Sequence, residues 1–518
     1  MLKSRSAQVG LFDAAVVMGP LPEGSFFALL AEHGDRIVRD QDFAECYSER
    51  MGRPSIPPSQ LAKVMLLQHR TGVSDEQAME CVGWDLRWKV ALGLPIDHHG
   101  WHPTSLTKFR ARLLLHKKEG VALENTLRLA AELGLLDGTV EQIVDSTPML
   151  GAAATQDTVR LVRYGVRKLI DAVSAVDQDA GGLLVAGLEF DYARPSEKPD
   201  CQWRLKAERE RMLTRVAQDA RRALQAVKQA DGLLEDENVK AACELLEELI
   251  GQDFDVDEDD VPRLHQGTRP GRIISAIDPE MRHGRKSSRS RFDGYKLSAA
   301  VTNSSEPLIM SVHVCPGGES DGPQAKHLID AQQQERRPER VLGDTAYGNG
   351  PVRGELAERH VDVLAPVPEG TILDEARLRK ADFTIDLKAG TVTCPAGHSV
   401  AIATAKNGVR RANFTGVICR DCPLKAACCP TQPRRQIRLV EHEDLLIAAR
   451  DALADPTTAE HLRRTRPRIE RLLGLLAHRY GARECRYIGS KKARLQAGWA
   501  AALVNLNPIG RHLATQTG

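Results

Sequence analysis

The sequence lacks the bulk features that would place it in a class at once. It has almost no net charge, with 71 Lys+Arg against 70 Asp+Glu and a balance of +1, so the total charge does not indicate a nucleic-acid-binding protein. It has no run approaching the roughly 18 apolar residues of a membrane helix, and we expect no membrane partner. Its first residues combine a weak apolar stretch with Asp13. This makes a poor secretory signal, so we expect a cytoplasmic, nucleoid-associated protein.

The charge that is present is unevenly distributed. Residues 461–494 contain 11 Lys+Arg and 2 Asp+Glu (11 − 2 = +9), and residues 269–296 contain 8 and 3 (8 − 3 = +5). Such segments can present positive faces to phosphate, or can be ordinary solvated faces. The acidic run DFDVDEDD (253–260) is not a calcium loop, because its sixth position is Glu258 rather than Gly and its twelfth is Leu264 rather than Glu. We interpret it as a solvated linker.

Cysteines are clustered near the C-terminal third of the chain. Of 11 cysteines, five fall between Cys394 and Cys429, which in a cytoplasmic protein favours metal binding over disulfides. A C-x2-C pair is a zinc-knuckle spacing. The sequence therefore predicts a structural Zn²⁺ site whose candidate ligands are Cys394, Cys419, Cys422 and Cys428. Cys429 or His398 could replace one ligand, and a group of buried or free thiols is the alternative.

The hydrophobic patterns predict an α/β core that carries insertions. Residues 20–130 are helical in pattern, and a short strand over 142–148 should end at Asp145, with Pro148 halting the ladder. Residues 296–302 and 308–314 read as the two strands of a hairpin.

Carboxylates stand where this core should carry chemistry. Asp145 and Asp344 each follow a short apolar strand, which fits either a turn or a catalytic ligand at the edge of a sheet. Glu470 falls in the first turn of a predicted helix and is surrounded by arginines, which fits either the helix dipole or phosphate-directed chemistry. Together these acids suit two Mg²⁺ or Mn²⁺ ions, which can activate a water or a 3′-hydroxyl.

Several of these stretches resemble a known family. The stretches are VDSTPMLGAAATQDTVRLVRYGVRKL, RIISAIDPEMRHGRKSSRSRFDGYKLSAAVTN, VLGDTAYGNG and RPRIERLLGLLAHRYG, together with the N-terminal GRPSIPPSQLAKVMLLQHRTGVSDEQAMECVGW. They are similar to bacterial insertion-sequence transposases of the DDE type, whose core is RNase H-like. The resemblance implies a metal-binding catalytic triad of Asp145, Asp344 and Glu470. It also implies cleavage of DNA at the terminal inverted repeats of an element and strand transfer into target DNA, by a homodimer because two ends must be joined.

The resemblance is incomplete around the glutamate. Some related transposases have a tyrosine seven residues before it and a lysine seven after it, where this chain has Arg463 and Ala477. The arginine four residues before it is kept as Arg466, and His478 or Arg479 could replace the lysine. The residues expected to bind DNA are Arg466, Arg282, Arg285, Lys286 and Lys296.

The expected organisation follows from these segments. The fold class is α/β, with an RNase H-like mixed-sheet core. The expected parts are an N-terminal helical DNA-binding domain (1–135), the core (136–180 and 270–365), a helical insertion with the acidic linker (181–269), a Cys-rich, β-containing insertion (366–450) and the C-terminal part of the core with the Glu470 helix (451–518).

Other functions fit parts of the sequence. A haloacid-dehalogenase-like phosphatase needs a second aspartate where this chain has Thr147. A non-enzymatic zinc-containing DNA-binding regulator would leave the acids without a role. An RNase H-like nuclease that cuts without strand transfer fits the same residues as a transposase.

Overall fold

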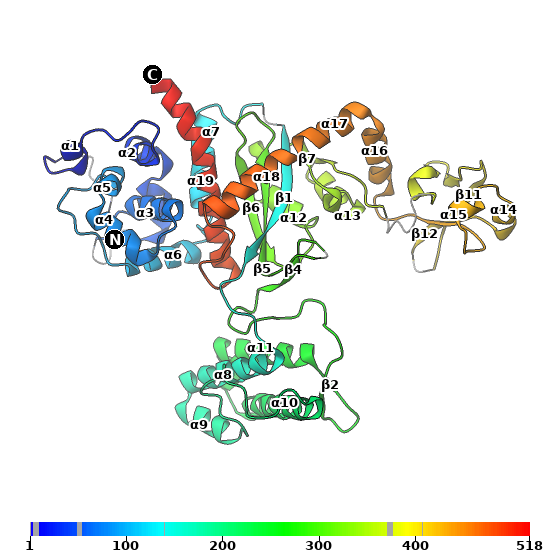
Figure 1. Ribbon diagram of the computed structural model, residues 1–518, viewed down its shortest axis with the longest axis horizontal. Helices are drawn as coiled ribbons and strands as arrows, with labels where there is room; N and C mark the ends of the chain where they lie inside the picture. The colour runs from blue at the N-terminus through cyan, green and yellow to red at the C-terminus, as the bar shows by residue number, and fades with distance from the viewer. Residues whose placement is uncertain are drawn as a thin grey trace.

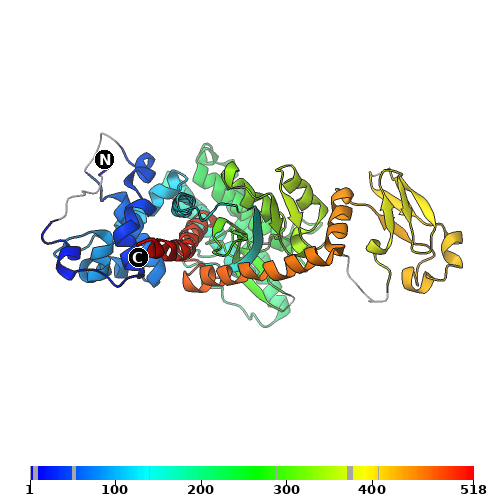
Figure 2. The ribbon, with the colours of Figure 1, turned by 90° about the horizontal axis from the view of Figure 1, so that it is seen from above.

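A mixed parallel and antiparallel β-sheet lies at the centre of the molecule, and the other parts of the chain are arranged around it (Figure 1). The computed structural model describes residues 2–3, 10–48, 54–138, 140–287, 289–369, 377–406 and 408–517. N-terminal helices lie on one side of the sheet and a small β-containing part lies at the opposite end of the molecule. Figure 2 shows the same succession from above.

Six strands form the central sheet, in the order β4–β5–β1–β7–β8, and β6 also pairs with β5. The strand β5 runs antiparallel to β1, whereas β7 runs parallel to β1 and β8 runs parallel to β7. The strands are β1 (Glu141–Leu150), β4 (Arg282–Arg285), β5 (Arg291–Thr302), β6 (Ile309–Pro316), β7 (Arg340–Leu342) and β8 (Asp362–Leu364).

The predicted hairpin is confirmed as β5 and β6, which pair antiparallel from Tyr295 to Val301. Consecutive residues of β5 from Gly294 onward are buried, because helices cover both faces of the sheet. The helices of the core and its C-terminal part are α12 (Gln324–Asp330), α13 (Gly350–Ala357), α16 (Glu443–Ala454), α17 (Pro456–Thr465), α18 (Pro467–Gly474) and α19 (Ser490–Thr517).

The prediction that the first strand ends at Asp145, with Pro148 halting the ladder, was wrong. The strand β1 continues to Leu150, and Pro148 pairs in register with Lys296 of β5. On its other side β1 pairs with β7 only as far as Ile143, so Pro148 lies beside an edge without a strand. Its carbonyl accepts a hydrogen bond from Arg483 on that side. A proline costs no ladder bond at such an edge.

The N-terminal helices share one hydrophobic core with the sheet. The last helix, α19, contacts α3, α6, α7 and β6, and its Trp499 is fully buried in that core together with Trp88 and Phe109. The N-terminal helices are α1 (Ala14–Met18), α2 (Phe26–Ile37), α3 (Pro58–Thr71), α4 (Asp75–Trp84), α5 (Leu86–Leu92), α6 (Thr104–Leu115) and α7 (Val121–Glu132).

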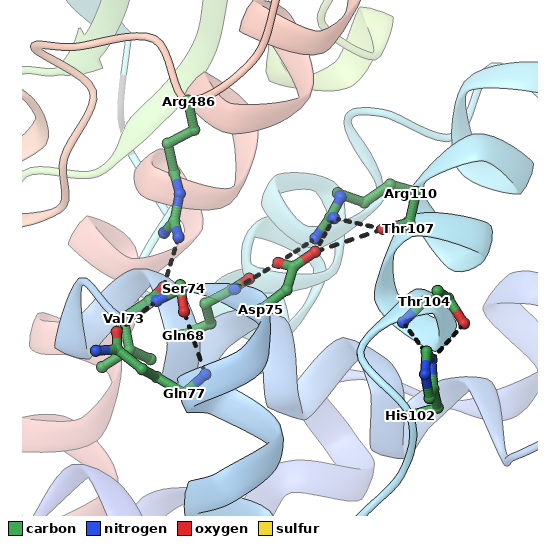
Figure 3. A network of polar contacts seen from close by, with 10 residues as sticks. All are labelled: Gln68, Val73, Ser74, Asp75, Gln77, His102, Thr104, Thr107, Arg110 and Arg486. Carbon is green, nitrogen blue, oxygen red and sulfur yellow. Dashed lines mark hydrogen bonds and ion pairs between the residues drawn. The ribbon is translucent and has the colours of Figure 1, made fainter.

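A polar network also joins these helices to the C-terminal part of the core (Figure 3). Ser74 caps α4, and its hydroxyl accepts from the backbone N–H of Gln77. Asp75 accepts from Arg110 of α6 and from Gln68 of α3. Figure 3 also shows Arg486, which precedes α19, donating to the carbonyl of Val73.

A separate helical bundle is inserted after β1. Its helices are α8 (Thr158–Val176), α9 (Gln178–Ala186), α10 (Lys206–Gln229) and α11 (Glu237–Asp253), followed by β2 (Phe254–Val256) and β3 (Pro262–Leu264). The structure packs α8, expected within the core segment, into this bundle's own hydrophobic cluster. The acidic run, expected as a linker, forms most of the β2–β3 hairpin. Asp253, the last residue of α11, is buried and forms a salt bridge with Arg272.

The Cys-rich insertion is a five-stranded antiparallel sheet with two short helices. Its elements are β9 (Thr384–Asp386), β10 (Thr391–Thr393), β11 (Ser399–Thr404), β12 (Arg410–Asn413), α14 (Gly416–Arg420), α15 (Lys425–Cys428) and β13 (Gln436–Arg438). Across the described parts of the chain, no helix is long and apolar enough to span a bilayer.

Candidate active site

The candidate site lies at a step in the sheet, by which we mean the point where the pairing between β1 and β7 ends. Beyond Ile143, β1 has no β7 partner, so the next residues of β1 border an open edge. Asp145 stands at this step and pairs in register with Ala299 on the other side of β1. Its Oδ1 accepts the backbone N–H of Ser146 at 2.8 Å. Asp145 therefore lies where the parallel pairing stops, although its strand continues.

Asp344 faces the same step from the end of β7. Gly343 follows β7, and the Asp344 carboxylate then caps a short 3-10 turn by accepting the backbone N–H of Ala346 at 2.8 Å. A Cβ on Gly343 would lie 2.8 Å from the ring of Tyr347, so the turn requires glycine there. The buried strand and the capped turn together fix the direction of the Asp344 carboxylate.

Glu470 reaches the site from α18. This helix begins at Pro467, buries Ile469, and leaves Glu470 exposed in its first turn. The helix contacts β1, which carries Asp145. After Gly474 the helix widens into a π-helical turn over Leu475–Arg479, and such turns are frequent at functional sites.

The three acids border one cavity of about 530 Å³. Its wall also includes residues from β1, β5, the end of β4, the loop after β6, α18 and the residues on either side of α18. Those that carry charge or a polar group are Ser146, Thr147, Arg285, Lys286, Lys296, Asp321, Arg466 and His478. Residues separated by 199 (344 − 145) and 126 (470 − 344) positions are thus brought together.

The surroundings of Asp145 disfavour its charged form. Burial raises the pKa of Asp145, and the carboxylates of Asp344 and Asp321 raise it further, against the lowering effects of the Ser146 N–H and of Arg466. Burial, with the same carboxylates nearby, also raises the pKa of Tyr347 well above its ordinary value. Among the described residues, the buried Tyr347 hydroxyl has no hydrogen-bond partner.

The donor chemistry fits divalent cations, since oxygen ligands suit Mg²⁺ and Mn²⁺. As it stands, however, no group of three or more His, Cys, Asp or Glu side chains in the described part of the chain has the geometry to hold a metal ion. The guanidinium of Arg466 occupies the space between Asp145 and Asp344, with Nη2 3.9 Å and 3.8 Å from their respective Oδ2 atoms.

The residues expected to bind DNA divide into two groups. Arg466, Arg285 and Lys286 line the cavity, and the last two are exposed. Lys296 also lines it, but its side chain is 90% buried and its Nζ lies 3.0 Å from Asp321. Arg282 does not line the cavity, because its guanidinium donates to the backbone carbonyls of the segment before β4.

Two residues of the site escaped the sequence analysis. Asp321 lies in GGESDGPQ, a segment that reads as a simple turn, and nothing local distinguishes it from the chain's other loop acids. Tyr347 follows Asp344 closely, but only the fold shows that its ring is buried beneath the acids. His478, considered as a replacement for the missing lysine, does line the cavity, whereas Arg479 is not among its lining residues.

The cysteines of the insertion gather in its hydrophobic core. Cys419, Cys428 and Cys429 are buried there, and Cys394 packs against them. Burial raises the pKa of Cys428 to about 11, and the neighbouring Cys429 thiol contributes. Cys422 is not part of this core cluster. The zinc set with Cys394, Cys419, Cys422 and Cys428 therefore stays a prediction.

Comparison with known families gives two matches. A family model described as "Transposase DDE domain" matches residues 393–509, and one described as "Transposase domain (DUF772)" matches residues 17–112. Residues 393–509 are therefore similar to the DDE domain of transposases, and residues 17–112 are similar to a second transposase domain. No curated protein and no solved structure matched the chain.

The two matches cover different parts of the chain. The DDE-domain match includes Glu470 and the part of the Cys-rich insertion from residue 393 onward, with its five cysteines, but begins after Asp145 and Asp344. Those acids are linked to Glu470 by the shared cavity rather than by the match. Transposases act on DNA, and a DDE domain implies dependence on divalent metal in general.

Proposed function

We propose that this transposase cleaves DNA at the ends of its element and transfers the freed strand, using Asp145, Asp344 and Glu470 as catalytic residues. The observation that carries the proposal is the convergence of these acids on one cavity from β1, the end of β7 and α18. A non-enzymatic DNA-binding protein would have no use for that convergence.

The topology of the sheet supports an RNase H-like core. Three antiparallel strands, β6, β5 and β1, continue into the parallel β7 and β8. In our interpretation β1 carries Asp145, β7 leads to Asp344, and α18, packed on the sheet, carries Glu470. The parts inserted between them would be accessory to the chemistry.

Each side chain has a defined task in this proposal. Asp145, Asp344 and Glu470 would hold two Mg²⁺ or Mn²⁺ ions, which when bound activate the attacking oxygen and stabilise the leaving oxygen. Arg466 would leave the space between Asp145 and Asp344 and pair with a DNA phosphate, since guanidinium groups bind phosphate through paired hydrogen bonds. Arg285 and Lys286 would hold the DNA backbone at the mouth of the cavity.

The proposed partners and assembly follow from the reaction. The terminal inverted repeats and the target DNA would both reach the cavity, the N-terminal helices would bind DNA, and two chains would join two ends as a homodimer on DNA.

A strand-transfer assay tests the joining step, which separates a transposase from a nuclease that only cuts. The substrate is a labelled duplex with an exposed 3′-hydroxyl at the element end, mixed with a supercoiled target plasmid and Mg²⁺. Label appearing in the plasmid, and absent with Glu470→Gln, is the expected result. Cleavage of the duplex without any labelled plasmid would favour the nuclease.

A further inference from the structure

A fourth carboxylate faces the cavity from outside the triad. Asp321 lies in the loop between β6 and α12 and lines the cavity wall. The next residue is Gly322, and a Cβ there would lie 2.5 Å from the carbonyl of Ala346, in the turn that Asp344 caps. This close approach brings the Asp321 loop against the Asp344 turn.

One oxygen of Asp321 contacts two side chains, through a hydrogen bond and an ion pair. Its Oδ1 lies 2.8 Å from Oγ of Ser146, the residue next to Asp145, and 3.0 Å from Nζ of Lys296. The same Nζ donates to the backbone carbonyl of Glu319 at 2.6 Å. Asp321 therefore links β1, β5 and its own loop immediately beside the triad.

Lys296 is an unusual lysine. Its side chain is only 10% exposed, yet it lines the cavity that the triad shares. A flexible ammonium group has many accessible rotamers, and a buried one needs a charged partner. Asp321 and the Glu319 carbonyl supply that partner and hold the ammonium in one place.

We propose that Asp321 is a positioning residue of the active site, which holds the ammonium of Lys296 at the cavity wall so that it contacts a DNA phosphate during cleavage. The inference rests on the proposed function and adds a residue to it. We infer this role rather than metal ligation because Oδ1 of Asp321 accepts from the Ser146 hydroxyl and forms an ion pair with the Lys296 ammonium.

The experiment measures Asp321→Asn with and without Lys296. Single-turnover nicking of a duplex that carries the element end is followed at saturating DNA, as a function of Mg²⁺. Lys296→Met should lower the rate by about 100-fold, the order of magnitude for loss of one positioned electrostatic contact. Asp321→Asn should lower it by about 10-fold in the wild-type background and by less than about 2-fold in the Lys296→Met background, because the two act as a unit.

The Mg²⁺ dependence separates positioning from ligation. We expect the Mg²⁺ concentration for half-maximal rate to be the same for Asp321→Asn and the wild type. An equal loss of rate from Asp321→Asn in both backgrounds would overturn the inference, as would an increased Mg²⁺ requirement. If Asp344→Asn nicks like the wild type, the proposed function fails and the inference falls with it. If only Asp321→Asn nicks like the wild type, the inference alone fails.

A second readout and a matched control guard against a folding defect. Loss of one phosphate contact should reduce the slope of log K against log salt for DNA binding by about 1 in Lys296→Met, and by a smaller amount in Asp321→Asn, which keeps the ammonium. Asp330→Asn breaks another aspartate salt bridge, with Arg359 at 2.7 Å, outside the cavity, and should leave rate and slope unchanged. An unchanged slope in Lys296→Met would overturn the inference.

Discussion

The guanidinium of Arg466 lies between two carboxylates, with Nη2 3.9 Å from Oδ2 of Asp145 and 3.8 Å from Oδ2 of Asp344. Arg466 connects α17 to α18, so the same backbone segment carries the arginine and, four residues later, Glu470. A cation stands where the proposal puts divalent ions. Metal binding and Arg466 are therefore expected to compete for the same two acids.

Removing this arginine tests that competition. Arg466→Ala should lower the nicking rate by about 100-fold, because a positioned cation at phosphate is lost. Without metal it should also lower the free energy of unfolding by about 0.5–1 kcal/mol, a discounted value because the pair is partly exposed. Urea unfolding with and without Mg²⁺ measures the second effect, and added Mg²⁺ should restore most of it. A loss of stability that Mg²⁺ leaves unchanged would contradict the competition.

Asp145 should be required for activity while lowering the stability of the metal-free fold. Its pKa is raised, first by burial and then by neighbouring carboxylates, so its charged form destabilises the metal-free fold at neutral pH. Asp145→Asn should therefore raise the free energy of unfolding without metal while abolishing Mg²⁺-dependent nicking. Increasing Mg²⁺ should raise the melting temperature of the wild type far more than that of the variant. A variant less stable than the wild type in the absence of metal would contradict this reasoning.

His69 should make the fold sensitive to mild acid. Burial, with Arg486 and Arg110 nearby, lowers its pKa from 6.5 to about 3, so it is neutral in the folded chain. The unfolded chain binds a proton below about pH 6.5, and stability is lost by up to about 1.4 kcal/mol per pH unit as the pH falls from there toward 3. Urea unfolding at pH 7.5 and pH 5.5 should show this loss, and His69→Leu should reduce it. The exposed His99→Leu is the control, and equal pH dependence in both variants would exclude His69 as the cause.

The Cys-rich insertion should contain zinc. Cys419, Cys428 and Cys429 already lie together, and thiolates are the ligands that structural zinc prefers. We expect about one zinc ion per chain by elemental analysis. Cys419→Ser should lose most of it, whereas Cys201→Ser, in the helical insertion, should keep it. Protein purified without chelators that holds no zinc, and melts at the same temperature after zinc is added, would refute the site.

Local patterns predicted the elements whose causes are local. The β5–β6 hairpin follows from two apolar strand patterns separated by a short turn. Pro148 was misjudged because a proline's cost depends on whether a strand lies on the side that its backbone nitrogen faces, and the short β7 is distant in sequence. The apolar pattern of α8 does not say which surface it covers, and the structure buries it in the insertion.

The candidate site was predictable only in part for the same reason. Asp145 and Asp344 could be noticed as acids beside strands, but 199 residues separate them (344 − 145), and no spacing rule spans that distance. Asp321 becomes visible only through its contacts with Ser146 and Lys296. Sequence reasoning finds candidate ligands, and the fold decides which of them share a cavity.

The most direct test of the central claim is metal-dependent nicking of a labelled duplex that carries the element end, by the wild type and by Asp344→Asn. The substitution removes the charge but keeps the shape and the acceptor oxygen that caps the turn after β7. The account predicts Mg²⁺-dependent nicking by the wild type and a loss of about 1,000-fold or more in the variant, with DNA binding retained. Equal nicking by both proteins would remove Asp344 from the chemistry and contradict the account.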